Sequence, residues 1–437
     1  MTTAASIQRL GLRLISKVGS LPVMAHPALR ARVGKVLHRS AHVGGAAQIA
    51  VGRAFAARKA PRVDPARTPP TTRRGVFDLT PTEDQQMLRE AARGLAEDVI
   101  RPAAAEADTD RTIPADVSRA AADLGLVLLG VPAELDGIAE DGSAVTGALV
   151  LEELARGDMG ITVGIMASAS VATALSLYGT ADQQATYLPH FTGTEPVKAA
   201  ALAIQEPQPL FDALSPRTTG VTGTGGITLN GVKALVPNAD SAELFIVSTM
   251  VDGSSRLVIV EANTPGITIE HDPAMGIRAA NTGRLLLTDV TVPTANLLGS
   301  TEDHLDAIRR SRLAWAAAAC GTAQAVLDQV IPYTKERHAF GEPIAHRQAV
   351  AFLIADIAIE LEGLRLVTWQ AAARLDAGQD ASEPIALARA LTSAHATQIG
   401  SHGVQLLGGH GFVKEFDNER WYRDLRGAGV LEGVLLI

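Results

Sequence analysis

The hydrophobic pattern of this chain changes its period twice, and this limits the folds it can adopt. From residue 76 to 197, apolar residues recur at helical spacing, as in SAVTGALVLEELARGD. Between 198 and 300, short β-rich runs such as ELFIVSTMV and RLVIVEA replace them. Long helical runs return over 301–437. The sequence therefore predicts a helical domain, a β domain and a second helical domain, in that order.

Local signals sharpen this prediction. A T-x-x-E capping box, Thr80 to Glu83, is expected to start the first helix. In the β domain, a Gly-Gly pair, Asn230-Gly231 and Asp252-Gly253 are typical of turns between antiparallel strands. The last region has long helices and short connections, which favours an antiparallel bundle of the four-helix type.

The first 75 residues form a separate basic extension and linker. They contain 14 Lys or Arg residues and one acidic residue, Asp64, whereas the whole chain has a formal net charge of −8. Residues 5–18 show a short basic amphipathic pattern, which indicates a helix that contacts a membrane surface or a partner. A helix packed on its own body and an import presequence remain open alternatives. Residues 60–75 are rich in Pro and Arg and are expected to form a linker.

Composition excludes several classes of protein. The acidic body and the 4% aromatic content argue against a nucleic-acid partner. The single cysteine, Cys320, excludes an internal disulfide framework and fits a reducing compartment. No apolar stretch approaches the roughly 20 residues of a membrane span. A cytoplasmic location is therefore expected, with peripheral membrane contact through residues 5–18 as an option.

Common phosphate-loop and metal signatures are missing from the sequence. There is no P-loop, no strand-borne G-x-G-x-x-G, no HExxH and no CxxC. A G-x-S-x-G nucleophile elbow is also missing. We therefore predict no metal site and look for chemistry elsewhere.

Three clusters in the last domain carry candidate site residues. KERHAFGEPIAHRQ places an arginine and an aromatic ring before a helix start, a combination that can hold a phosphate and cover a ring. GVQLLGGHGF ends a helix with backbone that side chains leave open. RDLRGAGVLEG carries one carboxylate, Glu432, among apolar neighbours, where scarce water would help it act as a base.

In this order, the three clusters resemble the acyl-CoA dehydrogenase family. The family's R-x-x-F-G appears as Arg337 to Gly341, its Q-x-x-G-G-x-G as Gln405 to Gly411, and its closing motif as Leu431 to Gly433. The resemblance covers about residues 77–433. It implies FAD bound between subunits of a homo- or hetero-oligomer, a dimer or tetramer. The residues that it assigns to FAD are Arg337, Phe340, Gln348, Gln405, Gly408 and Gly409.

The same resemblance implies a reaction, the α,β-dehydrogenation of an acyl-CoA thioester, as in fatty-acid β-oxidation. Glu432 aligns with the base that removes the α-proton, while flavin accepts the β-hydride. Arg312 and Gly433 fall at the substrate site. Some relatives carry the base on the first bundle helix, but the corresponding residue here, Ser311, cannot serve. An electron-transfer flavoprotein is the implied electron acceptor.

Two positions depart from the family pattern in the β domain. The segment usually read as T-E-P-G-A-G-S-D is here IQEPQPLFD, so Gln205 replaces a threonine. The later W-I-T is Leu235-Val236-Pro237, and Pro237 offers flavin neither a hydroxyl nor an N–H. These departures leave two alternatives open: a non-catalytic or weakly flavin-binding structural subunit of a hetero-oligomer, and a member that uses oxygen or another electrophile.

Overall fold

The computed structural model of this 437-residue chain describes residues 79–138, 142–192 and 199–437. They belong to one compact unit, Phe77–Ile437. The predicted basic extension and linker, residues 1–75, lie outside the described residues, so the predictions made for them stay predictions.

The first part of this unit is helical, as predicted. Its helices are α3 (Glu83–Leu95), α4 (Arg101–Asp110), α5 (Ala115–Asp123), α6 (Ala144–Gly157), α7 (Met159–Ile165), α8 (Ala167–Tyr178), α9 (Ala181–Tyr187) and α10 (Pro189–Thr192).

The start of α3 corrects one expectation. The capping box is formed by Thr82 and Gln85, two residues later than the predicted Thr80 and Glu83. The Gln85 amide also donates to Thr146 Oγ1 of α6 at 3.3 Å. Thr82-x-x-Gln85 fits the same capping-box pattern, so the prediction selected the wrong one of two overlapping candidates.

The middle part is one mixed sheet with the order β6-β7-β3-β2-β4-β5-β8, and β1 pairs with β4. Most neighbours are antiparallel, as predicted, but β1 and β2 each pair with β4 in parallel. The strands are β1 (Ala200–Ala203), β2 (Thr219–Gly223), β3 (Gly226–Val236), β4 (Leu244–Val251), β5 (Ser254–Glu261), β6 (Ile267–His271), β7 (Gly283–Val292) and β8 (Leu297–Leu298).

Two of the predicted turns in this sheet had different outcomes. Asp252-Gly253 joins β4 to β5, as expected. Asn230-Gly231 is not a turn; it lies inside β3, where the register to β7 shifts between Leu229 and Gly231. Gly231 is needed there because a Cβ would come within 2.5 Å of Thr218 Oγ1.

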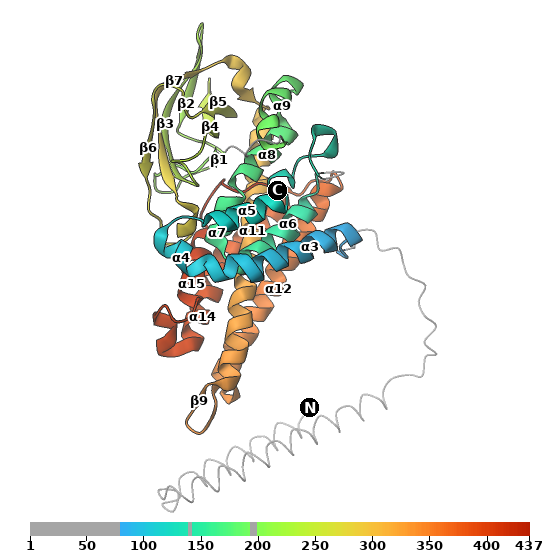
Figure 1. Cartoon of the computed structure of the whole chain (residues 1–437), viewed down its shortest axis with the longest axis vertical. Helices are drawn as coiled ribbons and strands as arrows, with labels where there is room; N and C mark the ends of the chain where they lie inside the picture. The colour runs from blue at the N-terminus through green and yellow to red at the C-terminus, as the bar shows by residue number, and fades with distance from the viewer. Residues whose placement is uncertain (1–78, 139–141, 193–198) are drawn as a thin grey trace, which may run out of the picture. The chain divides into compact units, whose positions relative to one another are not determined.

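The last part is a helical bundle around one long central helix, α11 (Thr301–Glu336). The other elements are a small hairpin, β9 (His338–Ala339) and β10 (Glu342–Pro343), followed by α12 (Gln348–Asp376), α13 (Ser382–Leu391), α14 (Thr397–Leu407) and α15 (Asn418–Ala428). Figure 1 shows α11 running between α6 and α12. The sheet lies at the upper left of that view, next to α8. The three-part fold predicted from the sequence is confirmed.

Small residues explain how α11 sits in the core. Residues 313–320 are fully buried, and five of them are alanine. At Gly321 an added Cβ would lie 1.9 Å from the carbonyl oxygen of Glu152, so α11 and α6 approach backbone to backbone. This close packing fixes the helix that carries Arg312.

In the described part of the chain, no single helix is long and apolar enough to cross a membrane. Helices α7 and α8, which are bent relative to each other, reach that length and apolar composition only when they are taken together. Nearly all residues of both helices are buried in this structure.

Candidate active site

Glu432 lies in the segment that follows α15, and only 7% of it is exposed to solvent. Burial of this carboxylate was expected, but its surroundings are not purely apolar. Arg312 of α11 and Arg389 of α13 both form salt bridges with it. The sequence did not single out Arg389.

The two carboxylate oxygens of Glu432 accept different numbers of hydrogen bonds from the two arginines. Oε1 accepts hydrogen bonds from Nε and Nη2 of Arg312, at 3.2 and 3.0 Å, and from Nη2 of Arg389 at 3.1 Å. Oε2 accepts one, from Nε of Arg312 at 2.9 Å. Oε2 is therefore the oxygen with more capacity left to accept a proton.

Arg389 is itself held in place. Its Nη1 donates to the carbonyl oxygen of Ala428, the last residue of α15, at 3.0 Å. Burial lowers the pKa of the Arg389 guanidinium, and the neighbouring Glu432 carboxylate opposes that effect. Arg389 thus ties the end of α15 and the base to α13 with one side chain.

The backbone around Glu432 is also fixed. The Glu432 N–H donates to Oε1 of Gln205 at 3.0 Å. Ser311 Oγ and Trp315 Nε1 of α11 donate to the carbonyl oxygen of Gly433, at 2.9 and 2.8 Å. Ser311, which cannot serve as a base, therefore positions the segment that carries the base.

A buried ion pair anchors the loop that carries Gln205. Lys233 Nζ lies 2.8 Å from Oε1 of Glu206, and both side chains are almost completely buried. Burial lowers the pKa of Lys233 to about 8. Burial alone would raise the pKa of Glu206, but Lys233 and hydrogen bonds outweigh it and hold that pKa at about 2. Gln205 therefore directly precedes a residue that this ion pair anchors.

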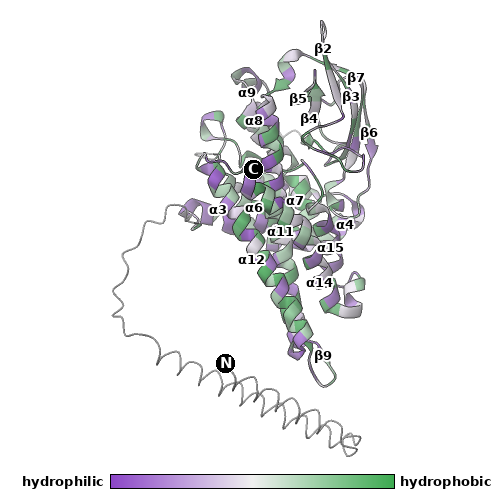
Figure 2. Ribbon diagram, turned by 180° about the vertical axis from the view of Figure 1, so that it is seen from behind, coloured by the Kyte–Doolittle hydropathy of each residue, from purple (hydrophilic) through white to green (hydrophobic). Residues whose placement is uncertain are grey.

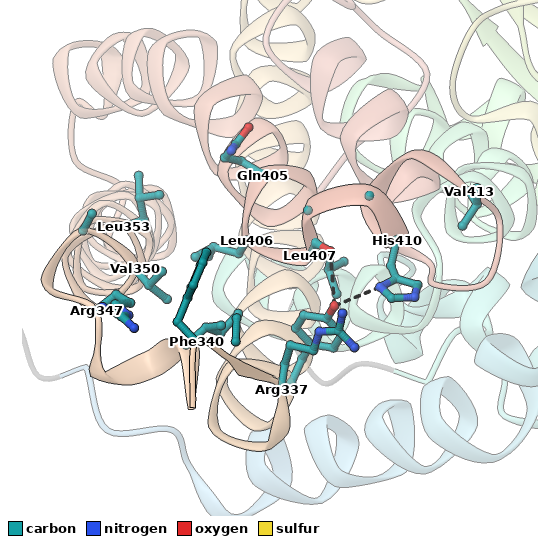
Figure 3. Close-up of a pocket in the computed structure, with 16 residues that line it drawn as sticks. Arg337, Phe340, Arg347, Val350, Leu353, Gln405, Leu406, Leu407, His410 and Val413 are labelled. Atoms are coloured by element: carbon teal, nitrogen blue, oxygen red, sulfur yellow. Dashed lines mark hydrogen bonds between the residues drawn. The ribbon is translucent and has the colours of Figure 1, made fainter. Parts of the chain in front are cut away.

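A cavity of about 860 Å³ lies elsewhere on the C-terminal helices. Figure 3 shows its labelled side chains coming from the end of α11, the hairpin, the start of α12, the end of α14 and the turn that follows α14. Of the six residues predicted to bind cofactor, five line this cavity: Arg337, Phe340, Gln405, Gly408 and Gly409. The sixth, Gln348, is exposed as the first residue of α12 and is not among the lining residues.

Phe340 has an unusual conformation at the edge of this cavity. It forms the two-residue loop between β9 and β10 with Gly341, and both have positive φ, 56° and 85°. Its ring is 95% exposed, and the Arg347 guanidinium carbon lies 5.6 Å from the ring centre. Residues held in sparsely populated backbone conformations cluster at active sites and ligand clamps.

The rest of the cavity can receive an anion and an apolar ring. Arg337 is exposed and forms no salt bridge with any described residue. Gly408 and Gly409 have nothing within 4 Å of a virtual Cβ, so a ligand can approach their backbone. Tyr333 OH contacts His410 Nδ1 at 3.1 Å on one wall.

Sequence reasoning missed Arg389, Arg347 and Tyr333. Arg347 precedes α12 in a motif that was already under consideration, so its charge was a usable signal. Arg389 and Tyr333 lie inside amphipathic helical patterns, where a single sequence gives no reason to select them.

Comparison with known proteins assigns the family. The chain matches the N-terminal, middle and C-terminal domain models of acyl-CoA dehydrogenase over residues 82–195, 201–290 and 303–435. The chain belongs to the acyl-CoA dehydrogenase family. This family of flavin-dependent oxidoreductases is the one that the sequence motifs resemble.

Individual relatives of this acyl-CoA dehydrogenase family member are similar to it in sequence or structure along most of its length. It is 33% identical over 364 residues to the short-chain specific acyl-CoA dehydrogenase of rat mitochondria, covering 80% of this chain and 87% of the relative. The structure of butyryl-CoA dehydrogenase from Megasphaera elsdenii matches with a TM-score of 0.74 at 28% identity, covering 82% of this chain and 96% of that one. A structure reported for the electron transferring flavoprotein system of Acidaminococcus fermentans matches with a TM-score of 0.74 at 30% identity, covering 82% and 96%.

Proposed function

We propose that this chain catalyses the FAD-dependent α,β-dehydrogenation of an acyl-CoA thioester, with Glu432 as the base. The observation that carries this proposal is the buried Glu432 carboxylate at the position that the family motif assigns to the base. The three family domain models matched along the chain support the reaction class.

The cavity residues fit one end of FAD. The Arg337 guanidinium suits a diphosphate, the Phe340 ring suits an adenine face, and Gly408 and Gly409 leave room beside the backbone. Arg347 and His410 add two further cationic or hydrogen-bonding groups. When bound, the flavin supplies the hydride acceptor for the reaction.

The base has to accept the α-proton while two arginines hold it. Oε2 receives one hydrogen bond against three at Oε1, so we assign proton transfer to Oε2. Arg312, predicted as a substrate residue, acts in this scheme as a positioning residue for Glu432. Gly433 acts through its carbonyl oxygen, which holds the segment to α11.

The developing enolate needs fixed hydrogen-bond donors. The Glu432 N–H is a backbone donor on the same residue as the base, and Gln205 Oε1 accepts its hydrogen bond. In our proposal the thioester carbonyl oxygen displaces the Gln205 amide and takes over this N–H. Gln205 therefore closes the site until substrate arrives.

A second candidate function is a non-catalytic subunit that supports an active partner. The same contacts favour it, because a base locked by two arginines and an amide occupied by Gln205 need no substrate. Under this alternative the contacts are permanent, and acyl-CoA does not disturb them.

We further propose an oligomer, a dimer or tetramer. Phe352, Ile359 and Leu366 of α12 are 58%, 70% and 51% exposed and are spaced seven residues apart, so they form one apolar stripe. Figure 2 shows hydrophobic residues along the length of α12. Electron-transfer flavoprotein is the proposed electron acceptor, supported by the Acidaminococcus fermentans match.

The proposed location is cytoplasmic, with membrane contact through residues 5–18 as an option. Cell fractionation of the full chain and of a chain lacking residues 1–75 tests both points together.

Absorbance spectroscopy separates the two candidate functions. The purified protein, supplied with FAD, is mixed with acyl-CoA thioesters without oxygen. Bleaching of the flavin band supports the dehydrogenase, and recovery of the band on adding air but not electron-transfer flavoprotein would indicate a member that uses oxygen. A protein that binds FAD but is not bleached by any acyl-CoA supports the structural subunit.

A further inference from the structure

The segment that follows the base, Val434–Ile437, is buried as tightly as the base itself. Its four residues are between 0% and 7% exposed. The chain reverses at Val434, whose φ is 76°, and Leu435 N donates to the Gly433 carbonyl oxygen at 3.0 Å. This is a positive-φ γ-turn at a β-branched residue, an uncommon and strained conformation. The surroundings must therefore hold the segment in place.

Hydrogen bonds from two helices hold it. Leu436 N donates to Ser170 Oγ of α8 at 3.0 Å. Arg310 Nη1 of α11 donates to the carbonyl oxygen of Ile437 at 3.0 Å. These two bonds hold the segment between α8 and α11.

Its side chains fill the space between these helices and α6. Leu436 packs in a cluster with Val171 and Leu175 of α8. Ile437 meets α6 at Gly147, where an added Cβ would come within 2.8 Å of the Ile437 Cβ. The remaining cavity beside Leu436 and Ile437 is only about 20 Å³. We call this space, bounded by α6, α8 and α11, the apolar slot.

The position of the slot gives it a role in the proposed reaction. A base that removes an α-proton lies beside the carbon next to the thioester, so the rest of the acyl chain extends away from that point. Apolar chains bind in apolar concave space. The protein's own Leu436 and Ile437, which follow Glu432 by four and five residues in the chain, occupy the slot.

We propose that Leu436 and Ile437 are specificity-determining residues that fill the far end of the acyl-chain site and restrict the substrate to short acyl groups. This inference rests on the proposed function, because it takes Glu432 as the base. A longer chain would have to push out two large apolar side chains, with no cavity to receive them. A short chain ends before it reaches them.

The test compares butyryl-CoA with octanoyl-CoA on the FAD-loaded full chain. Leu436→Ala opens the slot at its most buried large side chain, and Ile437→Ala is a milder change at the more exposed end. The control is Leu229→Ala, the same change at a fully buried position in the β-sheet core. Two quantities are measured for each protein: the dissociation constant by titration calorimetry and kcat/KM.

The inference predicts that wild type prefers butyryl-CoA. Leu436→Ala should raise the octanoyl-to-butyryl ratio of kcat/KM about tenfold or more and lower the same ratio of dissociation constants by a similar factor, because each removed methylene is worth on the order of tenfold. Ile437→Ala should shift both ratios less, in the same directions. Leu229→Ala should leave both ratios unchanged. Should Leu436→Ala misfold, Ile437→Ala carries the test.

Equal binding of the two thioesters by wild type, or ratios that neither variant alters, would overturn the inference. If the proposed function fails but the inference holds, acyl-CoA will not bleach the flavin of any of these proteins. The octanoyl-to-butyryl ratio of dissociation constants will still differ between wild type and the variants. Calorimetry therefore decides the inference without requiring turnover.

Discussion

Arg389 Nη2 lies 3.1 Å from Oε1 of Glu432, although 43 residues separate the two in the chain. Both side chains are largely buried, so this contact is shielded from solvent. Together with Arg312 it determines the orientation of the base before any substrate arrives.

Arg389→Ala removes one of two cationic partners from a buried carboxylate. We expect the free energy of unfolding to fall by about 1–3 kcal/mol, because Arg312 still pairs with Glu432. Arg389→Lys keeps the charge and should recover part of the loss. Urea denaturation measures the change, and Arg426→Ala, at an exposed position of α15, is the control. No difference between Arg389→Ala and the control would refute a stabilising role for this pair.

Gly433→Ala tests the backbone next to the base. Gly433 has a φ of 73°, and an added Cβ would lie 2.4 Å from the Ile204 Cβ. Left-handed strain and the steric clash should lower stability by about 1–3 kcal/mol and reduce turnover. Gly94→Ala is the matched control, because its Cβ would meet nothing within 4 Å in helix α3. We expect Gly94→Ala to be neutral or slightly stabilising.

Phe340→Ala tests the cofactor cavity without affecting the core. Since the ring is 95% exposed, the unfolding free energy should change by less than about 0.5 kcal/mol. FAD affinity should fall by about 1–3 kcal/mol if the ring stacks on the adenine. Fluorescence titration with FAD measures this. Val221→Ala, at another exposed apolar side chain, on β2 of the sheet and outside the cavity lining, should bind FAD like wild type. Equal losses in both variants would argue against the assignment.

Asp424 should make stability depend on pH. It is buried near Asp158, and these two effects raise its pKa to about 8, from 3.8 in the unfolded chain. The folded state therefore holds a proton that the unfolded state has already released between these values. Stability must fall as pH rises through this window, by on the order of 2 kcal/mol from pH 6 to pH 8.

Asp424→Asn removes the titrating group and retains an acceptor for the Ile277 N–H. The unfolding free energy of this variant should vary less between pH 6 and pH 8 than that of wild type. Urea denaturation at several pH values measures both. Asp98→Asn, at an exposed position, should retain the wild-type slope. A wild-type protein whose stability is flat or rises over this range would contradict the prediction.

The parts of the structure that could be predicted from sequence are those that local patterns encode. The change of hydrophobic period located the three-part fold, and the motif around Glu432 located the buried carboxylate. The hairpin at Asp252-Gly253 followed from turn chemistry. Each of these signals lies within a few residues of the feature it predicts.

The parts that escaped prediction depend on contacts between distant segments. Gln205 accepts a hydrogen bond from the Glu432 N–H although 227 residues separate them, and the local sequence around either residue does not predict this contact. Asn230-Gly231 has the composition of a turn, yet pairing of β3 with β7 on both sides turns it into a bulge.

The most direct test of the central claim, that Glu432 removes the α-proton, is the rate constant for flavin bleaching by acyl-CoA without oxygen. Glu432→Gln keeps the shape of the side chain and one acceptor oxygen but removes the base. We predict rapid bleaching in wild type and a rate constant on the order of 10²–10⁴-fold lower in Glu432→Gln, with acyl-CoA still bound. Bleaching of Glu432→Gln at the wild-type rate would contradict the assignment of Glu432 as the base.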